Sequence, residues 1–164
     1  MGPVSSAKTT EVLHQGHVGL EAWKNLLRSH SQLIQELDEQ LRERHNFCLG
    51  DYDVLVNLAN APGQRRRMCA LADAVLLSPS GLSRRVDRLE HAGFVRRERA
   101  TNDARNIEAG LTPAGTRLLR RLRDTHLASV KERFVDRFSD DELDSLRDLL
   151  GRLTANEPIA DQRC

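Results

Sequence analysis

The sequence has few aromatic residues and no long apolar segment. Phe, Trp and Tyr make up only 4% of the 164 residues, so we expect a core built mainly from Leu, Val and Ala. No run of about 18 apolar residues is present, and the sequence therefore predicts no membrane helix. Residues 1–8 lack the apolar stretch of a secretory signal, and the three cysteines are odd in number and widely spaced. These features predict a cytoplasmic protein that does not contact a membrane.

The motifs of common enzyme classes are missing as well. The six histidines form no H-E-x-x-H motif, and no Cys-x-x-Cys pair accompanies them. There is no glycine-rich phosphate loop and no G-x-S-x-G nucleophile turn. We therefore expect no metal site, no cofactor and no enzymatic function.

A helix with two contrasting faces is predicted to begin at Ser78. The Ser78 hydroxyl can cap the first turn, and Pro79 is tolerated at the first helical position because its missing N–H has no partner there. Leu82, Val86 and Leu89 recur at helical spacing and form one apolar stripe. The outer face carries Ser80, Arg84, Asp87 and Arg88, with Ser83 and Arg85 on its flanks.

The segments on either side complete a recognisable arrangement. A shorter helix is predicted over residues 68–75, close enough to Ser78 for a helix-turn-helix. Residues 95–100 and 106–111 are expected to form two strands joined by the turn 101–105. A helix, a turn, a second helix and a basic hairpin then follow in this order.

This stretch resembles the DNA-binding core of the MarR family of bacterial transcription regulators. The family's wing motif D-x-R-x5-L-T is present as Asp103, Arg105, Leu111 and Thr112, and a looser similarity covers roughly residues 20–154. The resemblance implies a mainly α protein with a small β-wing, in which a winged helix-turn-helix lies between long terminal dimerisation helices. It also implies a homodimeric repressor that small aromatic acids or phenols release from DNA.

The charge distribution agrees with a nucleic-acid partner. The net charge is only +1, but residues 62–105 contain ten Arg and five acidic residues. That segment therefore carries +5, and the remainder, with 15 basic and 19 acidic residues, carries −4. Basic charge concentrated on the groove-reading elements is the expected electrostatic footprint of a protein that binds double-stranded DNA.

Each candidate DNA contact has an expected role. We predict that Ser80, Arg84 and Arg88 contact base edges, where arginine can donate two hydrogen bonds to guanine. We expect Asp87 to orient Arg84 or a wing arginine, and Asp103 to hold a wing arginine in an ion pair or to act as a simple turn residue. Ser78, Ser83 and Arg85 are candidates for phosphate contact, although the stem of Arg85 could instead lie on the edge of the core. Arg97 and Arg99 are candidates for wing contacts, and Arg105 for insertion into the minor groove. The run 65–67, three arginines, is either a further phosphate patch or a solvated loop.

Long amphipathic helices predict the rest of the architecture. They are expected at about 20–44, 113–137 and from a capping box at 139–142 onward. We predict a flexible arm at 1–17, a single domain at 18–154 and a tail at 155–164. Within the domain, 18–48 and 113–154 should dimerise and 51–112 should bind DNA; an intrachain bundle of the long helices is the alternative.

The residues offer two candidates for the signal that controls such a regulator. Trp23 and His30 share a helix face and could contact a planar anionic effector, although a purely interfacial role is the simpler interpretation. Cys48 is a candidate redox thiol, with His45 close enough to activate it, or else a small buried side chain. A winged-helix module that binds protein instead of DNA is the remaining alternative.

Overall fold

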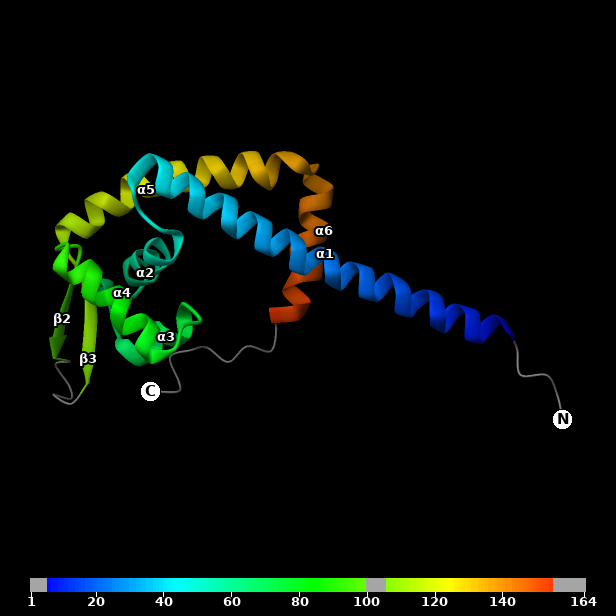
Figure 1. Ribbon diagram of the computed structural model, residues 1–164, viewed down its shortest axis with the longest axis horizontal. Coiled ribbons are helices and arrows are strands. Elements are labelled where there is room, and N and C mark those ends of the chain that lie inside the picture. The colour runs from blue at the N-terminus through cyan, green and yellow to red at the C-terminus, as the bar shows by residue number, and fades with distance from the viewer. Residues whose placement is uncertain (1–5, 100–105, 155–164) are drawn as a thin grey trace. The chain divides into compact units, whose positions relative to one another are not determined.

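The computed structural model describes residues 6–99 and 106–154, which are mainly helical and include a three-stranded sheet (Figure 1). In chain order the elements are α1 (Ser6–His45), α2 (Leu49–Ala59), a 3₁₀ turn (Pro62–Gln64), β1 (Arg65–Arg67), α3 (Met68–Ala74), α4 (Pro79–His91), β2 (Val95–Arg99), β3 (Ile107–Leu111), α5 (Pro113–Arg133), a second 3₁₀ turn (Val135–Arg137) and α6 (Asp140–Thr154). The predicted fold class, mainly α with a small β-wing, is confirmed. No helix among these residues is both long and apolar enough to cross a membrane.

The chain falls into two units, divided between Glu36 and Leu37 within α1. The first unit is a single helix that begins at Ser6, inside the segment 1–17 for which the sequence predicts an arm. Its apolar side chains are largely exposed: Val18, Leu20, Trp23, Leu26, Leu27 and Ile34.

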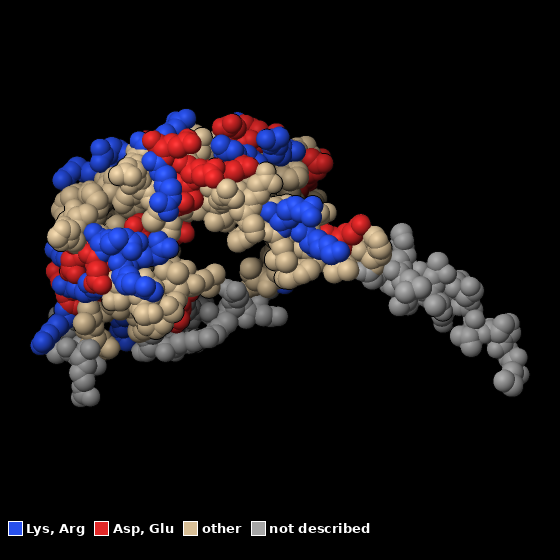
Figure 2. All heavy atoms as spheres, viewed as in Figure 1, with Lys and Arg blue, Asp and Glu red and all other residues tan. Residues whose placement is uncertain are grey.

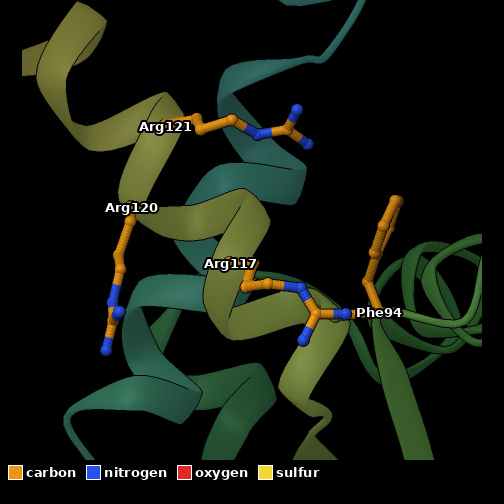
Figure 3. A pocket seen from close by; sticks show the side chains of 5 residues that line it. Phe94, Arg117, Arg120 and Arg121 are labelled. Atoms are coloured by element: carbon orange, nitrogen blue, oxygen red, sulfur yellow. The ribbon is translucent and has the colours of Figure 1, made fainter.

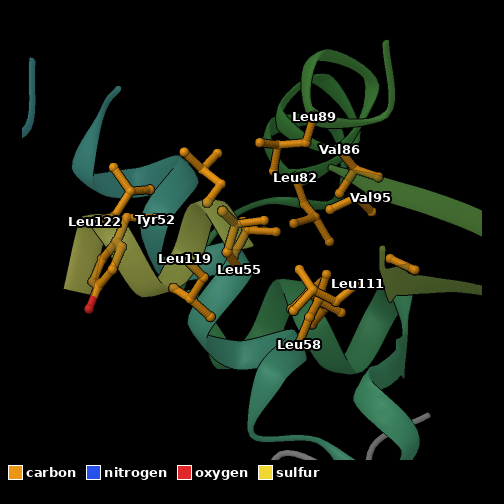
Figure 4. Packing of buried hydrophobic residues seen from close by; sticks show 14 of the residues in the cluster. Tyr52, Leu55, Leu58, Leu82, Val86, Leu89, Val95, Leu111, Leu119 and Leu122 are labelled. Atoms are coloured by element: carbon orange, nitrogen blue, oxygen red, sulfur yellow. The ribbon is translucent and has the colours of Figure 1, made fainter. Parts of the chain in front are cut away.

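The second unit has a continuous leucine-rich core, as the scarcity of aromatic residues predicts. Figure 4 shows side chains of α2, α4, α5 and the sheet meeting in one cluster. Its fully enclosed members include Leu55, Leu58, Leu82, Val86 and Leu122. The core therefore fixes the apolar side of α4 and leaves the other side of that helix free.

The two ends of α4 follow the local sequence signals. Ser78 Oγ accepts a hydrogen bond from Gly81 N–H at 3.1 Å, which confirms the N-cap. At the other end Gly93 adopts a positive φ of 77°, and its N–H donates to the carbonyl of Glu90. Phe94 N–H donates to Leu89 O at 2.9 Å, which completes a Schellman motif. Local hydrogen bonds thus define where α4 starts and ends, and the direction in which the chain leaves it.

The sheet contains one strand more than the sequence predicts. β2 and β3 form the expected hairpin, with Val95 opposite Leu111 at its base and Arg99 opposite Ile107 near its tip. β1 pairs with the other edge of β3 in antiparallel register, so the order is β1-β3-β2. The interpretation of residues 65–67 as a loop was therefore wrong. Three consecutive arginines carry no apolar alternation, and only the pairing with β3 makes them a strand.

The C-terminal helices start as predicted. Thr112 caps α5 by accepting from Gly115 N–H at 3.0 Å, and the capping box of α6 forms between Ser139 and Glu142. α5 ends at Arg133, shorter than the predicted 113–137, because a 3₁₀ turn follows. Several apolar side chains of α6 are exposed, among them Leu149, Leu150 and Leu153.

Candidate nucleic-acid interface

The outer face of α4 carries the polar side chains that the helical spacing predicts. Ser80, Arg84, Asp87 and Arg88 are exposed, and Ser83 and Arg85 on the flanks are half-buried. Arg84 has no ion-pair partner among the described residues. Figure 2 shows basic side chains gathered over α4 and over the first part of α5. This face of α4 thus presents one unengaged guanidinium among several cations.

The cap region of α4 is polar as well. Ser78 Oγ also lies 3.3 Å from Ser80 Oγ, so both hydroxyls sit at the helix N-terminus. Backbone N–H groups at a helix N-terminus favour an anion, and a phosphate is such an anion. Ser78 is therefore engaged in capping while its neighbour remains exposed.

A carboxylate that was not predicted from the sequence binds two arginines of α4. Asp51 in α2 is 8% exposed, and its Oδ1 lies 3.0 Å from Arg85 Nη1 and 2.9 Å from Arg88 Nη2. Burial lowers the pKa of the Arg85 guanidinium, but the Asp51 carboxylate outweighs this and raises it. Arg85 lies half-buried against the edge of the core, whereas Arg88 binds Asp51 from the exposed face of α4. An acidic residue in a first helical turn is common, so Asp51 gave no sequence signal of this role.

Cys48 belongs to the same cluster. It is a half-buried free thiol at the N-cap of α2, and Arg85 Nη1 lies 3.5 Å from its Sγ. His45 Nε2 hydrogen-bonds with Thr125 Oγ1 at 2.7 Å, and the activation of Cys48 by His45 stays a prediction. The cation beside Cys48 is a recognition-helix arginine.

A second arginine cluster joins the wing to α4. Arg97 Nη1 in β2 lies 2.7 Å from both Asp87 Oδ1 and Glu90 Oε2, and Arg97 Nη2 donates to the carbonyl of Ser83 at 3.2 Å. Burial lowers the pKa of Arg97, and the two carboxylates raise it by more. The expectation that Asp87 orients a wing arginine is confirmed, and Glu90 is an additional partner. Arg97 therefore fixes the angle between helix and wing.

The outer part of the wing is only partly described. Arg99 is exposed at the end of β2, while Asp103 and Arg105 lie outside the described residues. Glu98 pairs with Arg96 at 2.8 Å and with Arg65 of β1 at 3.6 Å, so β1 adds charge to the sheet that supports the wing.

The expected effector residues lie on the first unit. Both residues lie on α1, where Trp23 is 55% exposed and His30 is exposed. Among the described residues of the first unit, neither side chain has a hydrogen-bond or ion-pair partner. No group of three or more His, Cys, Asp or Glu that could hold a metal occurs in residues 6–99 and 106–154. The described geometry favours electrostatic and hydrogen-bonding recognition along α4.

Comparisons with known proteins point in the same direction. The family model described as "MarR family" matches residues 49–107. The HTH-type transcriptional regulator PecS of Dickeya dadantii is 29% identical over 130 residues, covering 75% of this chain and 74% of that protein.

Two solved structures from Streptomyces coelicolor are more similar in sequence. AbsC, a MarR family transcriptional regulator, is 30% identical with a TM-score of 0.76, covering 94% of this chain and 97% of AbsC. Sco3205, a MarR family regulator crystallised in complex with DNA, is 32% identical with a TM-score of 0.78, covering 85% of this chain and 91% of Sco3205.

Proposed function

Because the chain belongs to the MarR family of transcriptional regulators, we propose that two copies bind a pseudo-palindromic operator and repress transcription. In this proposal α4 enters the major groove and the wing contacts the adjacent minor groove. Ser80, Arg84 and Arg88 contact bases, and Ser78, Ser83 and Arg99 contact the backbone. Asp103 and Arg105 organise the wing tip.

The observation that carries this proposal is the contrast among the α4 arginines. Arg85 is held by Asp51 and the wing's Arg97 by Asp87, whereas Arg84 extends from the exposed face with no partner among the described residues. A fixed scaffold around a free guanidinium is what a bidentate contact to guanine requires. The likeness to Sco3205, which was crystallised with DNA, supports the same orientation. Arg85 and Arg97 then act mainly by positioning.

Exposed apolar surface supports the dimer. Trp23 and Leu27 on α1 are exposed, and Leu153 on α6 is 67% exposed. Apolar side chains that recur along one helix are covered in most soluble proteins. A second copy of this chain would bury them and place two α4 helices about 34 Å apart, one turn of DNA. A small effector that changes this spacing would release the DNA, and Trp23 with His30 is the proposed contact.

A second candidate signal is oxidation, which one observation favours. Cys48 Sγ accepts a hydrogen bond from Arg85 Nη1 at 3.5 Å, so this thiol contacts an arginine of α4 directly. A peroxide would oxidise the thiol to sulfenic acid and alter this contact with α4. Cys48→Ser should then abolish the loss of DNA binding on peroxide treatment; an unchanged response in the serine variant would leave no role for the thiol.

The central test is DNA binding by the whole protein. Fluorescence anisotropy with the duplex upstream of its own gene should give sharp, salt-sensitive binding that random duplex does not match. Light scattering on the same sample should give the mass of two chains, and Leu153→Glu should lower it while Arg152→Glu should not. Equal affinity for both duplexes up to micromolar protein would favour a winged-helix module that binds protein.

A further inference from the structure

A basic pocket lies on the second unit at the start of α5. It is a largely open depression of about 560 Å³, lined by Phe94, Ala114, Arg117, Arg120 and Arg121. In Figure 3, Arg117 and Arg121 extend toward the side of α5 on which Phe94 lies, and Arg120 extends the other way. The volume suits a small molecule, since ligand sites commonly measure about 300–1,000 Å³.

The pocket's positive charge is not balanced within the described protein. Arg117, Arg120 and Arg121 are exposed, and none has an ion-pair partner among residues 6–99 and 106–154. Arg117 and Arg121 are four residues apart on one helix face, where like charges destabilise a helix. Elsewhere in this chain Arg85 and Arg88 of α4 and Arg96 and Arg97 of β2 are paired with carboxylates, whereas Arg84 is not. An anion of more than one charge would remove the repulsion.

The backbone of Phe94, the aromatic residue of the pocket, is bound to the start of α5. The carbonyl of Phe94 accepts from Thr112 N–H and from Thr112 Oγ1, each at 3.1 Å. Gly115 permits this approach, because a Cβ there would lie 2.1 Å from the Phe94 oxygen. Phe94 is half-buried, and its ring contacts Phe47 edge-on at 6.4 Å between centroids. The half-buried ring thus lies beside the two exposed guanidinium groups of Arg117 and Arg121.

The pocket lies at the end of the hairpin opposite the wing tip. It adjoins the base of the hairpin, where Val95 pairs with Leu111, whereas the wing tip follows Arg99. Four strand residues separate these ends by about 13 Å at 3.3 Å per residue. Neither Arg117 nor Arg121 lies on α4 or on the hairpin. The charge of Arg117 and Arg121 is therefore not part of the recognition helix or of the wing.

We propose that this pocket binds a phosphorylated small molecule with a flat ring, of the nucleoside diphosphate class. The guanidinium groups of Arg117 and Arg121 donate forked hydrogen bonds to phosphate oxygens. The flat ring stacks on Phe94, as nucleobases do on aromatic side chains. A single carboxylate would leave one of the two arginines unpaired, which favours the diphosphate. The ligand then sits where α4 ends and α5 begins.

Calorimetry on the full chain tests the site with three probes: GDP, inorganic pyrophosphate and guanosine. We expect saturable binding of GDP, weaker binding of pyrophosphate and none of guanosine. The double substitution Arg117→Gln and Arg121→Gln should weaken GDP binding at least about tenfold, because hydrogen bonds to charged groups are lost. Phe94→Leu should weaken GDP binding and leave pyrophosphate binding unchanged.

Arg123→Gln is the matched control, since Arg123 is exposed on the same helix but does not line the pocket. It should leave GDP binding intact. An equal loss in this control, or no saturable binding of either GDP or pyrophosphate, overturns the proposal. So does a fall in DNA affinity of the double variant as large as that of Arg84→Ala, which would make the patch a DNA contact. Unchanged DNA binding of the double variant without ligand supports the separate site.

Discussion

Asp51 of α2 and Arg85 of α4 are joined by an ion pair of 3.0 Å at the edge of the core. The same carboxylate oxygen also accepts from Arg88 at 2.9 Å. One side chain of the supporting helix thus fixes two arginines of the recognition helix. The orientation of the DNA-contacting face therefore depends on a residue that need not touch DNA.

Asp51→Asn tests this positioning role. The amide keeps the size of the side chain but loses its charge, so Arg85 remains half-buried without its ionic partner. We expect the free energy of unfolding to fall by about 1–3 kcal/mol, the range for a buried polar group left unsatisfied. DNA affinity should fall as well. Urea unfolding and anisotropy measure the two effects, and Asp73→Asn, exposed on α3, should change neither.

Gly50→Ala separates helix propensity from packing. Alanine in a helix should add up to about 1 kcal/mol of stability over glycine. At this position, however, the new Cβ would lie 2.5 Å from Arg85 Nη1, so the guanidinium must move away from Asp51. We expect no gain in the urea midpoint and a loss of DNA affinity. Gly151→Ala has no atom within 4 Å of the new Cβ and should show the stabilisation expected of the helix alone.

Local features of the fold could be predicted from the sequence. The Ser78 cap, the Gly93 C-terminus and the Ser139 capping box each depend on residues close together in the chain, and all three form. The apolar stripe of α4 likewise depends only on helical spacing. The side of α4 that faces outward therefore followed from the sequence.

The partners of the arginines could not be predicted in the same way. Asp51 and Arg85 are 34 residues apart, and their contact depends on how α2 packs on α4. The sequence therefore gave Arg85 the role of a phosphate contact, whereas the structure provides it with an internal partner. β1 was missed for a similar reason, because its pairing with β3 spans more than 40 residues. His45 was assigned to Cys48 by proximity in the chain, and its hydrogen bond with Thr125 on α5 could not be predicted in this way.

Arg84 and Arg99 should differ in their effect on specificity. Under the proposed function Arg84→Ala should lower discrimination between the operator and single-base variants by about 1–3 kcal/mol at one position. Arg99→Ala should instead weaken binding to all duplexes and reduce the salt slope by about one unit. Anisotropy titrations at several salt concentrations measure both. Equal losses on operator and random DNA for Arg84→Ala would contradict a base contact.

His126 should make the stability of the protein depend on mildly acidic pH. This half-buried histidine of α5 lies against Tyr52, with ring centroids 4.7 Å apart, and its Nδ1 is buried without a hydrogen-bond partner in the described residues. Burial lowers the pKa of His126 below its ordinary value of 6.5. The unfolded chain therefore binds this proton more tightly than the folded one. The contribution of neutral His126 to the free energy of unfolding is fully present above pH 6.5. It is lost as the pH falls toward the pKa that His126 has in the folded protein.

His126→Gln removes this titrating group, so the free energy of unfolding should depend less on pH. Urea midpoints measured from pH 7.5 down to pH 5 should fall more steeply for the native chain than for this variant. His91→Gln, at an exposed position on α4, should keep the native slope. If His126→Gln and the native chain lose stability in parallel over this range, the acid sensitivity arises at other groups and the buried imidazole contributes none of it.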